Sequence, residues 1–196
     1  LNDWTTWYRT THAHNTVLID GCGQSRRAFQ SQEQWIESAA AKTFWHSDDF
    51  SDVAVATYEG PFGACENTDV DGAGPGAPVY RHRRSVLFVK PGYFVVFDEL
   101  TGEGAHTFEA LFHFMPYRVL IDADTGAVRT GRMEKPNIEL LPLTDLDSRL
   151  ICGQNDPVQG WVSIDHEDVP APVAILSTKT EFPLRTGYVI APFRAG

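Results

Sequence analysis

Apolar and polar residues alternate along much of the chain with a period of two. The clearest case is Thr107 to Met115, where Phe108, Ala110, Phe112 and Phe114 fall on one face and polar residues fill most of the other. Successive side chains of a strand point to opposite faces of a sheet, so this pattern predicts a strand with one face in the core.

Similar short runs, rich in β-branched and aromatic residues, recur along the chain. Arg84 to Lys90 and Tyr93 to Leu100 are joined by the turn pair Pro91-Gly92 and predict a hairpin. Asp124-Thr125 predicts a second hairpin tip. Further strands are predicted at Val53 to Tyr58, Val119 to Ala123, Gly126 to Thr130, Asn137 to Leu141, Gly160 to Ile164, Val173 to Ser177 and Thr186 to Ala191.

Helical periodicity is nearly absent. Ser31 to Lys42, around Trp35 and Ile36, is the one segment that could form a short helix. We therefore predict an all-β fold, a large antiparallel β-sandwich with at most one short helix, as a single domain over residues 1–196. Gly60 to Pro78 is rich in Gly and Pro, lacks a strand pattern and predicts a long loop, of a length that in compact domains is functional or mobile.

Composition narrows the function classes. The formal net charge of -10 argues against a nucleic-acid partner, because phosphate binding needs clustered Lys and Arg. Local basic clusters such as Arg81-His82-Arg83-Arg84 still leave room for an acidic ligand. No apolar run of about 18 residues occurs, so no membrane span is expected. Three cysteines allow one disulfide and leave its pairing open.

Two histidines, His12 and His14, lie one residue apart before the aliphatic run Val17 to Ile19. If the chain is extended here, side chains at i and i+2 share a face, and the two rings can serve one site. The competing interpretation is that both are surface or supporting residues.

Other polar groups could complete a site. Asp48, Asp49 and Asp52 cluster beside His46, and Tyr58 ends a predicted strand where the long loop begins. His82 stands where that loop re-enters the sheet. Two imidazoles and a carboxylate suit zinc or a similar divalent ion, so His14, His82 and one acid of this cluster predict a metal site. No short metal motif supports it, and each histidine could instead be structural, as we expect for His106, His113 and His166.

Four stretches carry a family resemblance: Trp7-Tyr8-Arg9-Thr10-Thr11-His12-Ala13-His14-Asn15-Thr16-Val17-Leu18-Ile19-Asp20-Gly21, the run from His82 to Asp98, Leu111-Phe112-His113-Phe114 and Gln159-Gly160-Trp161-Val162. They resemble the C-terminal β domain of the heparinase II/III-like polysaccharide lyases. The first two are specific, and together the four span nearly the whole chain.

The resemblance implies a carbon–oxygen lyase that cleaves uronic-acid polysaccharides by β-elimination. Such enzymes pair this sandwich with an N-terminal α/α toroid, and the substrate lies between the two. A Tyr and a His share the proton transfers, while an Asn and a His of the toroid neutralise the uronate carboxylate. The resemblance also implies a periplasmic or secreted location and an acidic polysaccharide or oligosaccharide as the ligand.

Carried over by position, the resemblance gives each candidate a role. His12 and Tyr58 are the expected catalytic groups, and Arg9 and Asn15 are expected to contact the substrate. The expected metal ligands are His14, His82, Asp49 and Asp52, with zinc the first choice and calcium or manganese the alternatives.

The chain begins with the aromatic stretch Leu1 to Tyr8 and contains no toroid, so we expect a fragment with incomplete lyase activity. One alternative is a non-catalytic carbohydrate-binding sandwich that uses its tryptophans, Trp4, Trp7, Trp35, Trp45 and Trp161. A second is a structural or interaction module. The sequence does not indicate which uronate polymer would be the substrate.

Overall fold

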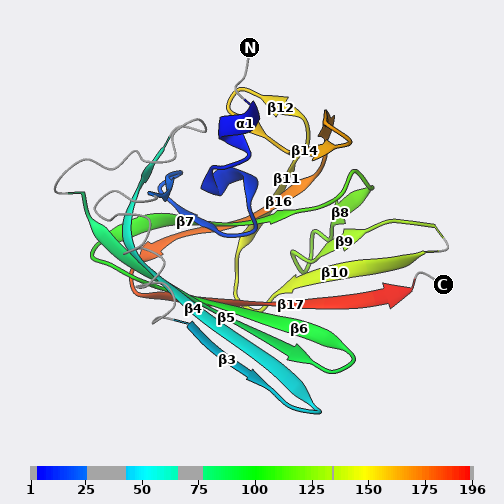
Figure 1. The fold of residues 1–196 in the computed structure, drawn as a ribbon, viewed down its shortest axis with the longest axis horizontal. Helices are drawn as coiled ribbons and strands as arrows, with labels where there is room; N and C mark the ends of the chain where they lie inside the picture. Colours follow the sequence, from blue (N-terminus) through cyan, green and yellow to red (C-terminus); the bar gives the residue numbers. More distant parts are fainter. Residues whose placement is uncertain (1–3, 26–42, 66–76, 134, 195–196) are drawn as a thin grey trace.

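The computed structural model describes residues 4–25, 43–65, 77–133 and 135–194. Antiparallel strands dominate this part of the chain and form two stacked sheets of very different size (Figure 1). A third layer of short elements covers the smaller sheet on its far side. The predicted all-β antiparallel sandwich is therefore confirmed.

The large sheet has nine strands in the part of the chain that the structure describes. Its order is β2 (Gly23–Gln24), β4 (Ser51–Ala64), β5 (Val79–Val89), β6 (Tyr93–Thr101), β17 (Leu184–Arg194), β10 (Pro136–Pro142), β9 (Val128–Thr130) and β8 (Val119–Ile121), and β3 (Thr43–Ser47) pairs with β4. Hairpins joining β3 to β4 and β5 to β6 extend beyond the small sheet, as Figure 1 shows at its lower edge.

The small sheet has four strands in the order β1 (Val17–Ile19), β7 (Ala105–His113), β16 (Val173–Glu181) and β11 (Asp147–Ile151). β1 is therefore an edge strand. The candidate histidines directly precede it, and the chain turns back at Asp20 directly after it. The position of β1 at this edge puts both flanking segments beside the large sheet.

The covering layer consists of α1 (Trp4–Trp7), η1 (Thr11–Ala13) and two hairpins, β12 (Gln154–Asn155) with β13 (Val158–Gln159) and β14 (Trp161–Ile164) with β15 (Glu167–Pro170). Trp7 anchors it, because its ring is buried and its Nε1 donates to the carbonyl of Val158 at 3.1 Å. Below this layer a small apolar cluster forms between Leu18, Leu111, Val173 and Ile175.

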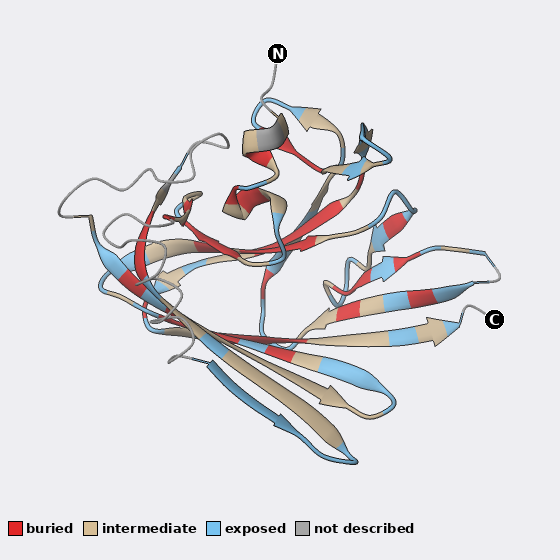
Figure 2. Cartoon of the chain, viewed as in Figure 1, coloured by how far each residue is buried: buried red, intermediate tan, exposed pale blue. Residues whose placement is uncertain are grey.

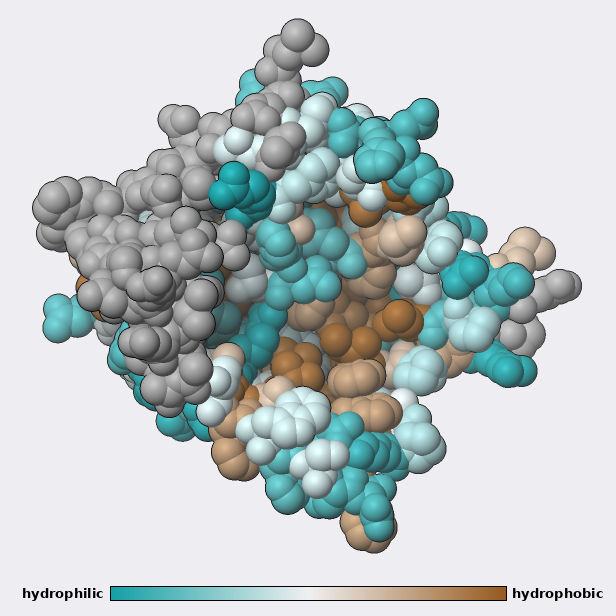
Figure 3. Space-filling view, in the orientation of Figure 1, coloured by the Kyte–Doolittle hydropathy of each residue, from teal (hydrophilic) through white to brown (hydrophobic). Residues whose placement is uncertain are grey.

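The main core lies between the two sheets. Phe108, Ala110 and Phe112 are buried there, as their alternation predicts, and Phe114 is half-buried against them. Figure 2 shows buried residues running along β7 and β16. Figure 3 presents the molecule in the same orientation as Figure 1. It shows hydrophobic residues in a hollow in the middle of the visible face, where the two sheets separate.

Most predicted strands are confirmed, but several elements differ. The expected loop from Gly60 begins later, because β4 continues to Ala64 and pairs with β2. β3 and β11 were not predicted, nor was α1. The helix predicted at Ser31 to Lys42 lies outside the described residues. Within the described residues, α1 and η1 are the only helical segments.

The turn between β3 and β4 depends on Asp48. Its Oδ1 accepts backbone N–H bonds from Phe50 at 2.8 Å and from Ser51 at 2.7 Å. We expect Asp48→Ala to lower the free energy of unfolding, since an aspartate that accepts such backbone N–H bonds stabilises the turn. Chemical denaturation measures it, with Asp49→Ala as the matched control. An equal loss in both variants would contradict the assignment.

Candidate functional site

Polar side chains line the inner face of the large sheet next to the β1 edge. Strand register pairs Tyr58 of β4 with His82 of β5, and Arg84 of β5 with Asp98 of β6. His82 and Arg84 are two residues apart on one strand, so both point to the same face as these partners. The sheet therefore presents a phenol, an imidazole, a guanidinium and a carboxylate as neighbours.

Three of these groups form a buried charged network. Asp98 is fully buried and accepts from His82 Nε2 at 2.7 Å, from Arg84 Nε at 2.7 Å and from Arg84 in a second contact at 2.8 Å. Burial alone would raise the pKa of Asp98, but the hydrogen bonds and charges of Arg84 and His82 lower it to about 2. Arg84 also donates to the backbone carbonyl of Asn15, which ties this network to the segment before β1.

His12 and His14 do not share a face. Residues Thr11–Ala13 form a turn of 3₁₀ helix, not the extended chain that the spacing argument assumed. At about three residues per turn, positions i and i+2 point in different directions. His12 is accordingly buried and His14 is exposed. The expectation of one shared face is therefore wrong.

The ring of His12 has one bonded nitrogen and one orphan. Its Nε2 lies 3.0 Å from the carbonyl oxygen of Gly21, which can only accept, so the proton is on Nε2. Nδ1 is buried and has no hydrogen-bond partner. Burial lowers the pKa of His12, so the ring is neutral near pH 7 and Nδ1 carries a free lone pair. This nitrogen can accept a proton.

Tyr58 is in the complementary protonation state, because its hydroxyl keeps its proton. Its hydroxyl is 2.8 Å from the carbonyl oxygen of Pro61 and 3.1 Å from that of Ser25, so the phenol donates. Burial raises the pKa of Tyr58 to about 12 and keeps the proton on the oxygen. A Cβ at Gly60 would lie 2.6 Å from the hydroxyl, so glycine there is what leaves room for it. Tyr58 is therefore protonated near pH 7 and can act as a proton donor in this state, not as a base.

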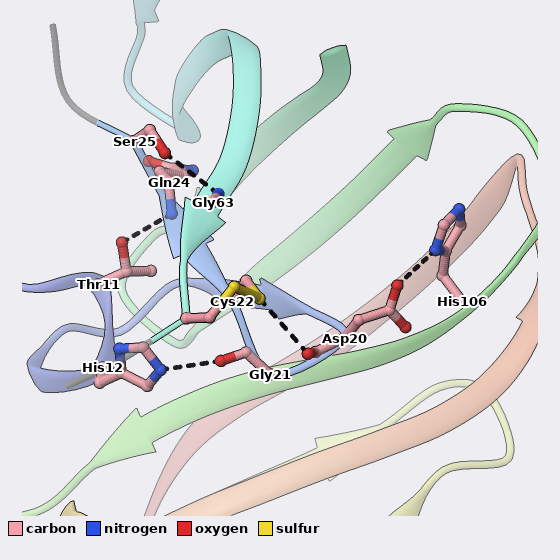
Figure 4. The surroundings of a disulfide bond; sticks show 10 residues. Thr11, His12, Asp20, Gly21, Cys22, Gln24, Ser25, Gly63 and His106 are labelled. Carbon is pink, nitrogen blue, oxygen red and sulfur yellow. Dashed lines mark hydrogen bonds and ion pairs between the residues drawn. A yellow bond between two sulfur atoms is a disulfide. The ribbon is translucent and has the colours of Figure 1, made fainter. Parts of the chain in front are cut away.

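One short segment, Gly21–Ser25, joins His12 and Tyr58. Figure 4 shows this segment beside His12. Gly21 accepts from His12, and Ser25 accepts from Tyr58. Between them the side-chain nitrogen of Gln24 lies 3.4 Å from Nδ1 of His82. A disulfide links Cys22 of this segment to Cys65, directly after β4, and resolves the pairing that the sequence left open. Cys152 is a free, exposed thiol.

A second set of polar residues holds the loop that carries the histidines. Asn15 Oδ1 accepts the backbone N–H of His113 at 2.7 Å, and Gln159 Nε2 donates to the carbonyl of His12 at 3.0 Å. The ring of His113 lies between them, with one nitrogen facing each amide oxygen. We expected His113 to be structural and did not single out Gln159. Both stand in the later stretches of the resemblance, which was the only signal for them.

The described residues do not assemble the predicted metal set. Asp52 pairs with Lys90 at 2.6 Å and lies six residues along β4 from Tyr58, which is about 20 Å at about 3.3 Å per residue. Asp49 is exposed beside it. Both nitrogens of His82 already have partners. No group of three or more His, Cys, Asp or Glu within the described ranges could hold an ion.

The described part of the structure does not bring the four predicted ligands together, and the ligand set stays a prediction. His14 keeps one feature of a ligand, because its Nδ1 bonds the carbonyl oxygen of Thr10 at 2.7 Å and so leaves Nε2 for another partner. A divalent ion, whether zinc, calcium or manganese, stays a prediction.

The residues expected to contact a sugar are spread over different surfaces. Arg9 and Asn15 are exposed near the loop that carries His12 and His14, the histidine loop. Trp7 is core, and Trp4 packs on Trp161 with ring centroids 5.1 Å apart. Trp45, on β3, is 67% exposed. Trp35 lies outside the described residues.

The pKa values of two histidines on β7, His106 and His113, should be shifted in opposite directions from the ordinary value. Burial lowers the pKa of His113 to about 4, so this ring stays neutral until the pH falls near that value. The hydrogen bond to Asp20 raises the pKa of His106, whose ring has acceptors at both nitrogens, Asp20 and the carbonyl of Glu103. NMR titration of the ring protons measures both. Asp20→Asn should reduce the rise at His106, since the carbonyl of Glu103 and the charge of Glu181 also contribute to it, and should leave His113 unchanged. A rise of undiminished size would contradict the pairing.

The model of the family described as heparinase II/III-like, C-terminal, matches residues 2–178. The chain belongs to this heparinase II/III-like family. The resemblance carried by the His12 and His82 stretches is thus confirmed, and it covers most of the chain.

Solved structures agree with this membership at the level of fold. The heparan sulfate lyase HepC from Pedobacter heparinus is similar with a TM-score of 0.68 and 18% identity, over 100% of this chain and 27% of that chain. A heparinase III gives a TM-score of 0.66 and 17% identity, over 100% of this chain and 26% of that chain. The heparinase II/III-like chain thus spans about a quarter of the length of these proteins.

A search of the curated proteins found no match to the chain. Among the residues that the structure describes, no helix has the length and apolar character needed to cross a bilayer.

Proposed function

We propose that this heparinase II/III-like chain is the β-sandwich part of a polysaccharide lyase that cleaves uronic-acid polymers by β-elimination. One observation carries the proposal. The Gly21–Ser25 segment holds a neutral imidazole with an orphan nitrogen at one end and a protonated phenol at the other. Acid–base catalysis needs two such groups in opposite states.

The chemistry assigns one role to each group. Nδ1 of His12 takes the C5 proton of the uronate, the C5–H electron pair forms the C4–C5 double bond, and the C4–O bond breaks. Tyr58 then gives its proton to the departing oxygen. No water enters and no metal-activated nucleophile is needed. Because the carboxylate must be neutralised for C5–H to ionise, donors near that group are required.

Other parts of the parent protein complete this proposal. Arg84 is already committed to Asp98, so donors for the uronate carboxylate would come from an N-terminal α/α toroid that closes the cleft. Arg9 and Asn15, exposed beside the histidine loop, would contact the sugar. Nδ1 of His12 is covered, so a productive complex requires the covering residues to move. A periplasmic or secreted location is part of the same proposal, since the resemblance to the family implies it.

The test is to incubate the chain and its full-length parent with a panel of uronate polymers, including heparan sulfate, hyaluronan and alginate. Ultraviolet absorbance of the unsaturated product is followed over time. We expect turnover of at least one polymer by the parent and little by the chain alone. Absence of product from the parent on every polymer would overturn the proposal, and strong turnover by the chain would overturn the need for a second domain.

A non-catalytic carbohydrate-binding sandwich is the second candidate. It is favoured by the β3–β4 hairpin, where Phe44 is 58%, Trp45 67% and Phe50 80% exposed. Aromatic rings exposed in this way can stack on sugar faces. Uronate binding that survives combined His12→Ala and Tyr58→Phe changes but is lost in Trp45→Ala would support this candidate over the lyase.

A further inference from the structure

The Cys22–Cys65 disulfide lies within the Gly21–Ser25 segment that joins the site residues. We infer that this disulfide is a positioning element of the proposed lyase site, and that its reduction lowers the turnover number while the fold persists. The inference rests on the proposed function, because it concerns the same His12 and Tyr58.

The segment contacts the site from both sides of the disulfide. Before Cys22, the carbonyl oxygen of Gly21 accepts a hydrogen bond from the ring Nε2–H of His12. After it, Gln24 approaches His82 and Ser25 accepts from Tyr58. Three side chains from η1, β5 and β4 thus take their hydrogen bonds from five consecutive residues, and a displacement of the segment would move all three contacts at once.

The segment also lies close against the histidine loop. The backbone N–H of Gln24 donates to Thr11 Oγ1 at 2.9 Å, one residue before His12. A Cβ at Gly23 would lie 2.6 Å from Thr11, so only glycine allows this approach. The position of His12 therefore follows the position of Gly21–Ser25 through two independent contacts.

Few noncovalent ties hold the segment to β4. β2 is two residues long, and its pairing with β4 shifts register between Gly23 and Gln24. Beyond it, Ser25 has one hydrogen bond each with Tyr58, Pro61 and Gly63. A strand this short has little stability of its own. The disulfide is the one covalent tie between the described parts of these two segments.

The bond is within reach of a reductant, since Cys65 is exposed and Cys22 is half-buried. A small dithiol would reduce it by two exchange steps. The dithiol is oxidised to its cyclic disulfide, and its two electrons and two protons convert the Cys22–Cys65 bond into two thiols. In an oxidising compartment the same pair re-forms the bond.

The experiment uses the full-length parent in three forms: oxidised, reduced with dithiothreitol, and carrying Cys22→Ser with Cys65→Ser. Turnover number and KM on a uronate polymer are measured well below the melting temperature. We expect the turnover number to fall by about 10- to 100-fold in the reduced and double-variant forms, because small misplacements of catalytic groups cost up to about 100-fold. Reoxidation should restore the reduced form and leave the double variant unchanged.

Cys152→Ser is the matched control, as Cys152 is a free thiol outside the segment, and its kinetics should be unchanged. A second readout is amide hydrogen exchange at Gln24 and Ser25, which should quicken on reduction. If all forms turn over equally below their melting temperatures, the inference is wrong even where the melting temperature falls. If no form has activity, the proposed function fails, and unchanged exchange at Gln24 and Ser25 would then overturn the positioning role independently.

Discussion

Asp98→Asn is expected to lower the free energy of unfolding by about 3–5 kcal/mol, the usual cost of breaking a buried charge network on one side. Asp98 is fully buried between Arg84 and His82. Asparagine fills the same space but carries no charge, so the half-buried guanidinium of Arg84 loses its counter-ion. This change has the largest stability effect that we predict.

The effect should depend on pH in a defined direction. The pKa of Asp98 is about 2 in the folded protein, against about 4 in an unfolded chain. The folded state therefore binds its proton less readily, and the stabilisation by ionised Asp98 is complete above about pH 4 and lost as the pH falls towards about 2. The stability curves of the wild type and Asp98→Asn should converge across that range.

Chemical denaturation at several pH values measures both effects, and Glu99→Gln is the matched control. Glu99 is the next residue on β6, faces the other side of the sheet and pairs with Arg83 and Arg185 at 2.6 and 3.1 Å. Because that network is partly exposed, its loss should cost less than about 1 kcal/mol. If Asp98→Asn costs no more than Glu99→Gln, the buried network does not stabilise this fold as we describe.

Tyr58→Phe is expected to lower the turnover number of the parent lyase by about 100- to 10,000-fold, the range for losing an acid or base group. Phenylalanine keeps the ring contact with Phe62, whose centroid is 5.6 Å from that of Tyr58, and removes only the hydroxyl. His12→Ala should cause a loss of the same order. The two losses should not add in the double variant, because the groups act in one reaction.

Initial rates of product absorbance and thermal melting are measured together, so that unfolding is separated from loss of chemistry. Tyr93→Phe is the control, since Tyr93 is 41% exposed at the end of the β5–β6 hairpin. A Tyr58→Phe variant that keeps full turnover would remove Tyr58 from the mechanism. A variant of His12 that keeps full turnover would remove Nδ1 as the base.

The strand pattern was predictable where one face of a strand enters the core. β7 is the best example, since its alternation put Phe108, Ala110 and Phe112 on the buried face. β3 was not predictable in the same way. All five of its residues are exposed, so burial imposes no alternation, and it forms through pairing with β4. β4 extended past Gly60 because β2 provides a pairing partner distant in sequence.

The site was predictable in its residue types and less so in its geometry. The sequence indicated His12, His82 and Tyr58, and β4–β5 register does place Tyr58 beside His82. It did not indicate that the chain turns at Thr11–Ala13 or that Asp98 holds His82. Such partners depend on register and tertiary contacts, which a local pattern does not encode. The roles of His12, Tyr58 and the predicted metal ligands stay predictions.

The most direct test of the central claim is whether water enters the product. The parent protein is incubated with a uronate polymer in water enriched in heavy oxygen, and the fragments are weighed by mass spectrometry. Measured before the hemiacetal oxygen of the new reducing end exchanges with the solvent, elimination predicts fragments that carry no label, with new non-reducing ends one water lighter than hydrolysis would give. Labelled fragments of full hydrated mass would show hydrolysis and would contradict the account.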